Sequence, residues 1–153
     1  MISYSPSCPY FSAYYQLPRP GRHFITNRAH GALGYSLSAA LGAWFGRPES
    51  KTVALMGDGS FGFTCGELET VCRARAPITF VVFSNASFGW IKASQYADKD
   101  ARYYNVDFGR TDQAAVAAAS ARSAGPGARA CSGSSSSALE LWAAGPGPGR
   151  RRR

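Results

Sequence analysis

Two continuous apolar runs, separated by a helical stretch, limit the folds open to this chain. The first run occupies residues 52–56 and the second residues 78–83. Continuous apolar runs of this length are typical of strands buried on both faces of a parallel sheet. Between them, residues 67–75 space their apolar side chains for one helical face, and Ala76-Pro77 ends that helix. The pattern predicts a β-α-β unit, whose crossover is expected to be right-handed.

Helices are also expected on both sides of this unit. Residues 34–45 combine bulky apolar side chains with small ones that allow close packing, residues 88–97 begin another helix, and residues 114–119 are rich in alanine. Alternating strands and helices predict an α/β fold in three layers, with a doubly wound parallel sheet and ligand-binding residues at the carboxyl ends of the strands. We expect this fold to be incomplete at its C-terminal end.

The composition changes near residue 120, and this suggests a boundary. The 153 residues suffice for one domain. Residues 123–153 consist mainly of Gly, Pro, Ser, Ala and Arg, with too little bulky apolar surface to repay the entropy of ordering. We therefore expect a partial domain over residues 1–119 and a disordered low-complexity tail over residues 120–153. A shifted reading frame in a GC-rich gene is a second explanation for such a tail.

Charge and composition exclude several classes of function. The net charge is +8, but Arg150 to Arg153 supply four of these charges and the other basic residues are scattered. This distribution does not favour nucleic-acid binding. The four cysteines have no CxxC spacing and there are only two histidines, so a zinc site is not expected. No membrane span or signal peptide is visible, and a reducing, cytoplasmic setting is the default.

The residues that follow the two predicted strands indicate a metal site. Asp58 lies between Gly57 and Gly59 directly after the first run, and Asn85 follows the second. Carboxylate and amide oxygens at neighbouring strand ends can share a Mg²⁺ ion, which also takes diphosphate oxygens and water. Flanking glycines let backbone N–H groups approach those phosphates. Two simpler roles stay open, a helix cap for Asp58 and a turn former for Asn85.

A dinucleotide fingerprint is a weaker interpretation of the same residues. Glycines at positions 57, 59 and 62 formally match Gly-x-Gly-x-x-Gly between a strand and a helix. Asp58 would place its charge against a pyrophosphate unless a cation intervened. The second strand also ends without an acidic residue to bind a ribose hydroxyl. A nicotinamide-binding Rossmann domain therefore remains only as a minor alternative.

Three motifs together resemble a known family. Gly57-Asp58-Gly59, followed after 25 residues by Asn85, resembles the thiamine-diphosphate motif. Residues 31–34 read Gly-Ala-Leu-Gly and residues 85–89 read Asn-Ala-Ser-Phe-Gly. Both resemble segments of acetolactate-synthase-like and 2-oxo-acid-decarboxylase-like enzymes. The resemblance covers only part of their C-terminal, thiamine-diphosphate-binding domain.

The resemblance implies a role for each matched position. It assigns Mg²⁺ to Asp58, Asn85 and the backbone carbonyl of Ser87. Diphosphate oxygens would contact the loop that holds Gly57, Gly59 and Ser60. The carbonyl of Gly31 would meet the amine of the aminopyrimidine ring, and Leu33 would be the apolar wedge that bends the cofactor.

The resemblance also implies a lyase or synthase that acts on 2-oxo acids by decarboxylation or carboligation. The glutamate that activates the cofactor belongs to a separate pyrimidine-binding domain, supplied by upstream sequence or by another chain, and the intact enzyme would be a homo-oligomer. No catalytic residue is expected in this chain, so we do not expect activity from the chain alone. A non-catalytic, truncated remnant is the alternative. Trp90, Lys92 and Gln95 follow the metal loop and are candidates for substrate contact, with packing and solvation as their simpler roles. Asp58→Ala is expected to abolish metal-dependent binding at little cost to the fold.

Overall fold

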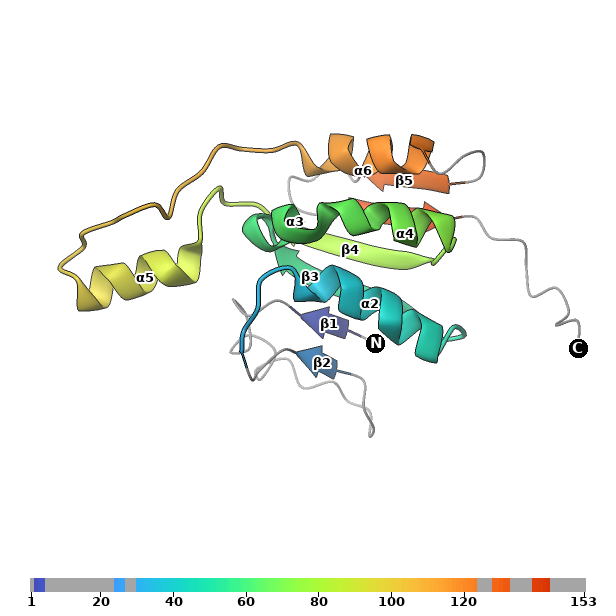
Figure 1. The fold of residues 1–153 in the computed structure, drawn as a ribbon, viewed down its shortest axis with the longest axis horizontal. Coiled ribbons are helices and arrows are strands. Elements are labelled where there is room, and N and C mark those ends of the chain that lie inside the picture. The colour runs from blue at the N-terminus through green and yellow to red at the C-terminus, as the bar shows by residue number, and fades with distance from the viewer. Residues whose placement is uncertain (1, 5–23, 27–29, 124–127, 133–138, 144–153) are drawn as a thin grey trace, which may run out of the picture.

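The computed structural model describes residues 2–4, 24–26, 30–123, 128–132 and 139–143. Within these residues, strands and helices alternate over most of the chain (Figure 1). In chain order the elements are β1 (Ile2–Tyr4), β2 (Phe24–Thr26), α2 (Tyr35–Gly46), β3 (Thr52–Gly57), α3 (Asp58–Thr64), the 3₁₀ turn η1 (Cys65–Glu67), α4 (Leu68–Arg73), β4 (Ile78–Phe83), α5 (Gly89–Asp98), α6 (Gln113–Ser123), β5 (Ala128–Ser132) and β6 (Leu139–Ala143).

The strands form one mixed sheet in the order β2-β1-β3-β4-β6-β5. The first four positions in that order are parallel neighbours, whereas β6 runs antiparallel to both β4 and β5. β3 and β4 pair in register from Thr52 with Ile78 to Gly57 with Phe83. This pairing confirms the predicted β-α-β unit. It also brings the carboxyl ends of the two strands to the same edge of the sheet.

One face of the sheet and the helices that cover it form the hydrophobic core. Burial alternates along β3 and β4, and the buried positions include Ala54, Met56, Ile78, Phe80 and Val82. Leu37, Ala40 and Leu41 of α2, Leu68 and Val71 of α4, and Ala117 of α6 belong to the same cluster. Figure 1 shows these three helices lying along the sheet. The small alanines let the helices approach closely.

The opposite face of β3 and β4 is less buried than the sequence predicts. Val53, Leu55 and Val81 are half-buried, and Phe83 is 49% exposed. The expectation of strands buried on both faces is therefore met on one face only within the described part of the chain. The physical reason is that α2, α4 and α6 all pack with the buried face. No described helix covers the other face, and residues 5–23, between β1 and β2, lie outside the description.

Two strands are described inside the segment expected to be a tail. β5 and β6 pair in antiparallel register from Ala128 with Ala143 to Ser132 with Leu139, and β6 joins the sheet beside β4. The expected boundary at residue 119 falls inside α6. The remaining residues of the expected tail, 124–127, 133–138 and 144–153, lie outside the described part of the chain.

α5 lies apart from the layered body of the domain. In Figure 1 this helix stands at one end of the molecule, and the chain returns from it to α6 along an extended path. None of its residues is buried. Trp90, Ile91 and Tyr96 of α5 are 57%, 47% and 67% exposed. The helix and the returning segment therefore form an excursion from the domain over residues 89–105.

Candidate functional site

The Asp58 carboxylate is the centre of a hydrogen-bond network that joins the ends of β3 and β4. The backbone N–H groups of Asn85 and Ala86 donate to its Oδ2 atom at 2.9 and 2.7 Å, and the Ser84 hydroxyl donates to the same atom at 3.3 Å. The Gly59 N–H donates to Oδ1 at 2.9 Å. Asp58 is only 7% exposed. Its carboxylate is therefore fixed in place, with Oδ1 the less engaged oxygen.

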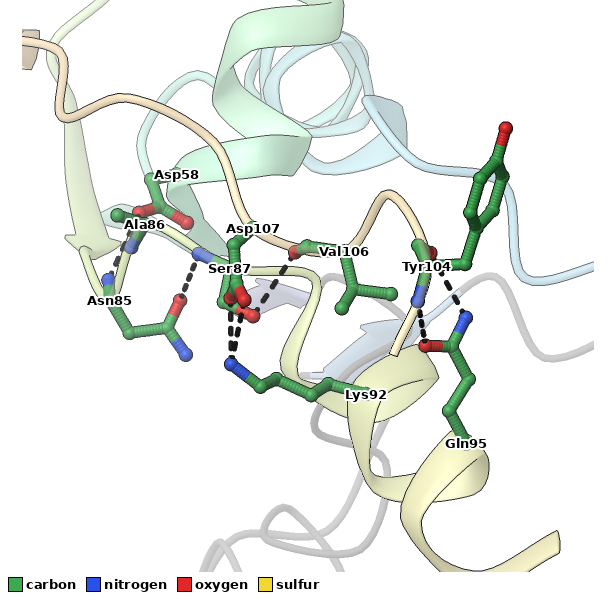
Figure 2. Close-up of polar contacts among 9 residues, drawn as sticks. All are labelled: Asp58, Asn85, Ala86, Ser87, Lys92, Gln95, Tyr104, Val106 and Asp107. Carbon is green, nitrogen blue, oxygen red and sulfur yellow. Dashed lines mark hydrogen bonds and ion pairs between the residues drawn. The ribbon is translucent and has the colours of Figure 1, made fainter. Parts of the chain in front are cut away.

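A left-handed residue makes this network possible. Ala86 has a φ of 56°, in a region that costs a non-glycine residue roughly 1–3 kcal/mol. The turn aims two successive N–H groups at one carboxylate oxygen, and charge-assisted bonds of this kind are stronger than neutral ones. Figure 2 shows the Asp58 carboxylate against the backbone of Asn85 and Ala86. The hydrogen bonds to Asp58 thus offset the energetic cost of the left-handed conformation of Ala86.

The Asn85 side chain lies beside this network. Its Oδ1 accepts the Ser87 N–H at 3.1 Å, so the amide oxygen is turned along the loop (Figure 2). This is the local turn that Asn side chains commonly form. The oxygen still has a lone pair for a further partner. The turn-former role and the metal-ligand role of Asn85 are therefore compatible.

A cavity of about 290 Å³ opens at these strand ends. Of the residues proposed from the sequence to bind cofactor or metal, all but Gly31 line it: Leu33, Gly57, Asp58, Gly59, Ser60, Asn85 and Ser87. Leu55, Met56, Phe83, Phe88, Gly89 and Trp90 complete the lining. The cavity thus has an acidic and polar part, around Asp58 and Asn85, and apolar walls.

The loop before α2 is attached to the same site through α3. The Gly34 N–H donates to Ser60 Oγ at 2.9 Å, and Thr64 Oγ1 donates to the Gly34 carbonyl at 2.9 Å. Gly34 has a φ of 85°, and a Cβ at this position would lie 2.7 Å from Thr64 Cγ2. Only glycine fits this position without strain. The sequence does not predict that Thr64 bonds to Gly34, because no local pattern indicates a contact between residues 30 positions apart.

The donor set fits a hard divalent cation. Asp58 Oδ1 has one hydrogen-bond partner and Asn85 Oδ1 has one, so each keeps acceptor capacity. Both residues line the same cavity. Oxygen donors in small number, with room for ligand oxygens, suit Mg²⁺. Among the described residues, no three His, Cys, Asp or Glu side chains lie close enough together to hold a metal ion. The protein ligands of an ion at this site would be the Asp58 carboxylate, the Asn85 amide oxygen and a backbone carbonyl oxygen.

Two of the three candidates for substrate contact have partners among residues 103–107 instead. Lys92 Nζ lies 2.8 Å from both carboxylate oxygens of Asp107 and 5.2 Å from the centre of the Tyr103 ring. Gln95 donates to the Tyr104 carbonyl at 3.1 Å and accepts its N–H at 2.9 Å. The hydrogen bond from Lys92 lowers the pKa of Asp107 below its usual range, and the nearby Ser87 hydroxyl lowers it further. Trp90 lines the cavity and remains a candidate for ligand contact.

Comparison with known proteins identifies the class to which this fold and site belong. The family described as "Thiamine pyrophosphate enzyme, C-terminal TPP binding domain" matches residues 7–143. The chain belongs to this family, as the resemblance of its motifs implied. The match includes β5 and β6 and extends beyond the boundary expected at residue 119.

Several of its curated relatives are acetolactate synthases. The acetolactate synthase of Bacillus subtilis (strain 168) is 36% identical over 103 residues, which are 67% of this chain and 18% of that protein. The isozyme 2 large subunit of Escherichia coli (strain K12) is 37% identical over 81 residues, 53% of this chain and 15% of that protein. A probable large subunit from Methanococcus aeolicus is 30% identical over 97 residues, 63% of this chain and 16% of that protein. The chain thus spans less than a fifth of the length of these relatives.

Proposed function

We propose that this chain binds thiamine diphosphate together with Mg²⁺. The observation that carries the proposal is the placement of Asp58 and Asn85 at the adjacent ends of β3 and β4, where both line one cavity. Asp58, Asn85 and the Ser87 carbonyl would hold the cation. Gly57, Gly59 and Ser60 line the same cavity and would receive the diphosphate.

The rest of the cofactor would extend toward the loop before α2. Leu33 lines the cavity and would support the bent form of the cofactor. Gly31 has a φ of 70°, and its carbonyl would accept a hydrogen bond from the aminopyrimidine amine. The bonds from Gly34 to Ser60 and from Thr64 to Gly34 would keep this loop at a fixed position relative to the diphosphate. The loop before α2 would thus position one end of the ligand, and the start of α3 the other.

The activity of the intact protein is a further proposal. When bound, thiamine diphosphate supplies an electron sink for decarboxylation of a 2-oxo acid. We infer that this chain supplies cofactor binding, while a pyrimidine-binding domain supplies the activating glutamate. A homo-oligomeric lyase or synthase acting on 2-oxo acids is the enzyme we propose. A remnant that binds cofactor without catalysis is the alternative that the same observation supports.

The complete architecture and cellular setting are proposals of the same kind. Half-buried Leu55 and Val81 and the exposed Phe83 support a second covering layer on the outer face of the sheet, as in a three-layer doubly wound fold.

In the described part of the chain, no helix is long and apolar enough to cross a membrane. We keep the cytoplasm as the proposed compartment, and residues 1–119 and 120–153 as the proposed division of the chain.

Calorimetric titration of thiamine diphosphate into the full 153-residue chain tests this function. We expect binding with excess Mg²⁺ and loss of binding with a chelator, because Asp58 would otherwise face an anionic ligand without a cation between them. Asp58→Asn should abolish the metal-dependent part, whereas Asp98→Asn, on the exposed surface of α5, should leave it intact. Equal affinity with and without Mg²⁺ would refute the proposal.

A further inference from the structure

The loop that carries two of the proposed metal ligands, residues 85–88, is called here the metal loop, and it is attached to a second, distant segment. The Phe88 N–H donates to the Val106 carbonyl at 2.8 Å, and the Phe108 N–H donates to the Ala86 carbonyl at 3.0 Å. Ser87 Oγ donates to the same Val106 carbonyl at 3.1 Å, and Ser87 pairs with Asp107 in an isolated β-bridge. Residues 106–108, called here the return strand, thus lie alongside residues 86–88.

Side chains of α5 bond both to the return strand and to the chain that leads back to it. Lys92 of α5 contacts both carboxylate oxygens of Asp107 at 2.8 Å. One turn further along α5, Gln95 makes two hydrogen bonds to the backbone of Tyr104. Figure 2 shows Ser87, Lys92 and Asp107 grouped together, with the Gln95 pair further along the excursion. The base of the excursion is therefore closed by an ion pair next to Ser87.

An aromatic contact joins the return strand to the first turn of α3, which holds Gly59 and Ser60. The Phe88 and Phe108 ring centres are 5.0 Å apart with a tilt of 57°, and Val106 is 3% exposed. A Cβ on Gly59 would lie 2.6 Å from the Phe88 ring and 3.5 Å from that of Phe108. The two rings therefore pack directly on the backbone of Gly59. A shift of the return strand would therefore be transmitted to residues 86–88 and to the start of α3.

We propose that the return strand positions the metal loop, and that Asp107, held by Lys92, is the positioning residue that keeps the Ser87 carbonyl directed at the cation. This role rests on the proposed function. Neither Asp107 nor Lys92 needs to touch the ligand, because the β-bridge and the Phe88–Phe108 contact connect the return strand to the metal loop. The affinity for Mg²⁺ and diphosphate would then depend on residues about twenty positions beyond Asn85.

The two members of the ion pair give a test that separates positioning from direct phosphate contact. If Lys92 instead bound phosphate, Asp107→Ala would release it and leave affinity unchanged or raised. Positioning predicts that Asp107→Ala and Lys92→Met each weaken Mg²⁺-dependent thiamine diphosphate binding about threefold to tenfold, and that the double variant is no weaker than either single one. Lys92→Arg keeps the charge and should bind within about twofold of the unchanged chain.

A matched control and a second readout exclude a general loss of structure. Arg73→Met breaks the exposed Arg73–Glu69 pair on α4, which has a similar N–O distance of 2.9 Å. Exposed pairs contribute little to stability, so the melting temperatures of metal-free Arg73→Met and Asp107→Ala should be alike. In the metal-free chain, Asp107→Ala should speed hydrogen exchange at the Phe88 and Phe108 amides, and Arg73→Met should not.

The outcomes are distinguishable. Unchanged or tighter binding by Asp107→Ala, or unchanged exchange at the Phe88 and Phe108 amides, overturns the positioning role. Failure of the unchanged chain to bind thiamine diphosphate with Mg²⁺ refutes the proposed function and, with it, a role of Asp107 in binding.

Discussion

Removal of the Asp58 side chain should destabilise the metal-free protein, and this revises the expectation from sequence. Asp58→Ala leaves four donors without their acceptor: the backbone N–H groups of Gly59, Asn85 and Ala86, and the Ser84 hydroxyl. The sequence alone suggested a ligand whose loss costs the fold little. The structure shows that the same carboxylate joins β3 to the loop after β4.

The size of the effect follows from the number and exposure of these bonds. Hydrogen bonds to a charged group contribute about 1.5–3 kcal/mol each when buried. Asn85 is exposed and Ala86 is half-buried, so water can replace part of what is lost. Counting mainly the two short bonds to Oδ2, we expect a loss of about 2–3 kcal/mol in the free energy of unfolding. For a chain of this size that is a fall of roughly 4–12 °C in melting temperature.

Thermal unfolding of the metal-free chain, followed by circular dichroism, measures this loss. The control is Asp98→Ala, which removes an exposed carboxylate with a single side-chain bond to Ser94. The control should lie within about 0.5 kcal/mol of the unchanged chain. Equal melting temperatures for Asp58→Ala and Asp98→Ala would show that the network around Asp58 does not hold the two strand ends together.

Two further predictions concern glycine and cysteine positions. Gly34→Ala should destabilise the fold by about 2 kcal/mol or more, because φ is 85° and the new Cβ would lie 2.7 Å from Thr64 Cγ2. Gly42 lies on α2 with open space around the position of a Cβ, so Gly42→Ala should stabilise the fold by about 0.5–1 kcal/mol. Urea unfolding of both variants tests this pair, and equal midpoints would contradict it. Burial, and to a lesser extent Glu69, raise the pKa of the Cys72 thiol, so it stays protonated to higher pH than an ordinary thiol. Because the thiolate is the reactive form, the 5%-exposed Cys72 should be alkylated more slowly than the half-buried free thiol of Cys65 in the native chain at neutral pH. Peptide mass spectrometry measures both rates, and equal rates would show that Cys72 is more accessible than described.

The sheet edge that carries the site could be predicted because its signals are local. Continuous apolar runs mark β3 and β4, and a parallel pair must end at one edge. The positions of Asp58 and Asn85 at that edge follow from the sequence directly. That both line one cavity is consistent with the interpretation of the motif.

The contacts that fix the site depend on distant residues and could not be predicted in this way. The left-handed turn at Ala86 has no signal in the residue type, since alanine does not favour positive φ. The pairing of Lys92 with Asp107 spans 15 positions and depends on the path of the excursion. In the same way, residues 128–132 and 139–143 are short segments within sequence rich in Gly, Ser and Pro. The pairing of β6 with β5 and with β4 places them in the sheet.

The most direct test of the central claim is to locate the cation in the full chain. Mn²⁺ can replace Mg²⁺ at oxygen-rich sites, and its unpaired electrons broaden the amide signals of nearby residues. With thiamine diphosphate present, we expect Mn²⁺ to broaden the signals of Gly59, Asn85 and Ser87 first, and to do so far less in Asp58→Asn. Broadening centred on the exposed acidic residues of the excursion, Asp98 and Asp100, with the signals of Gly59 and Asn85 unaffected, would contradict the account.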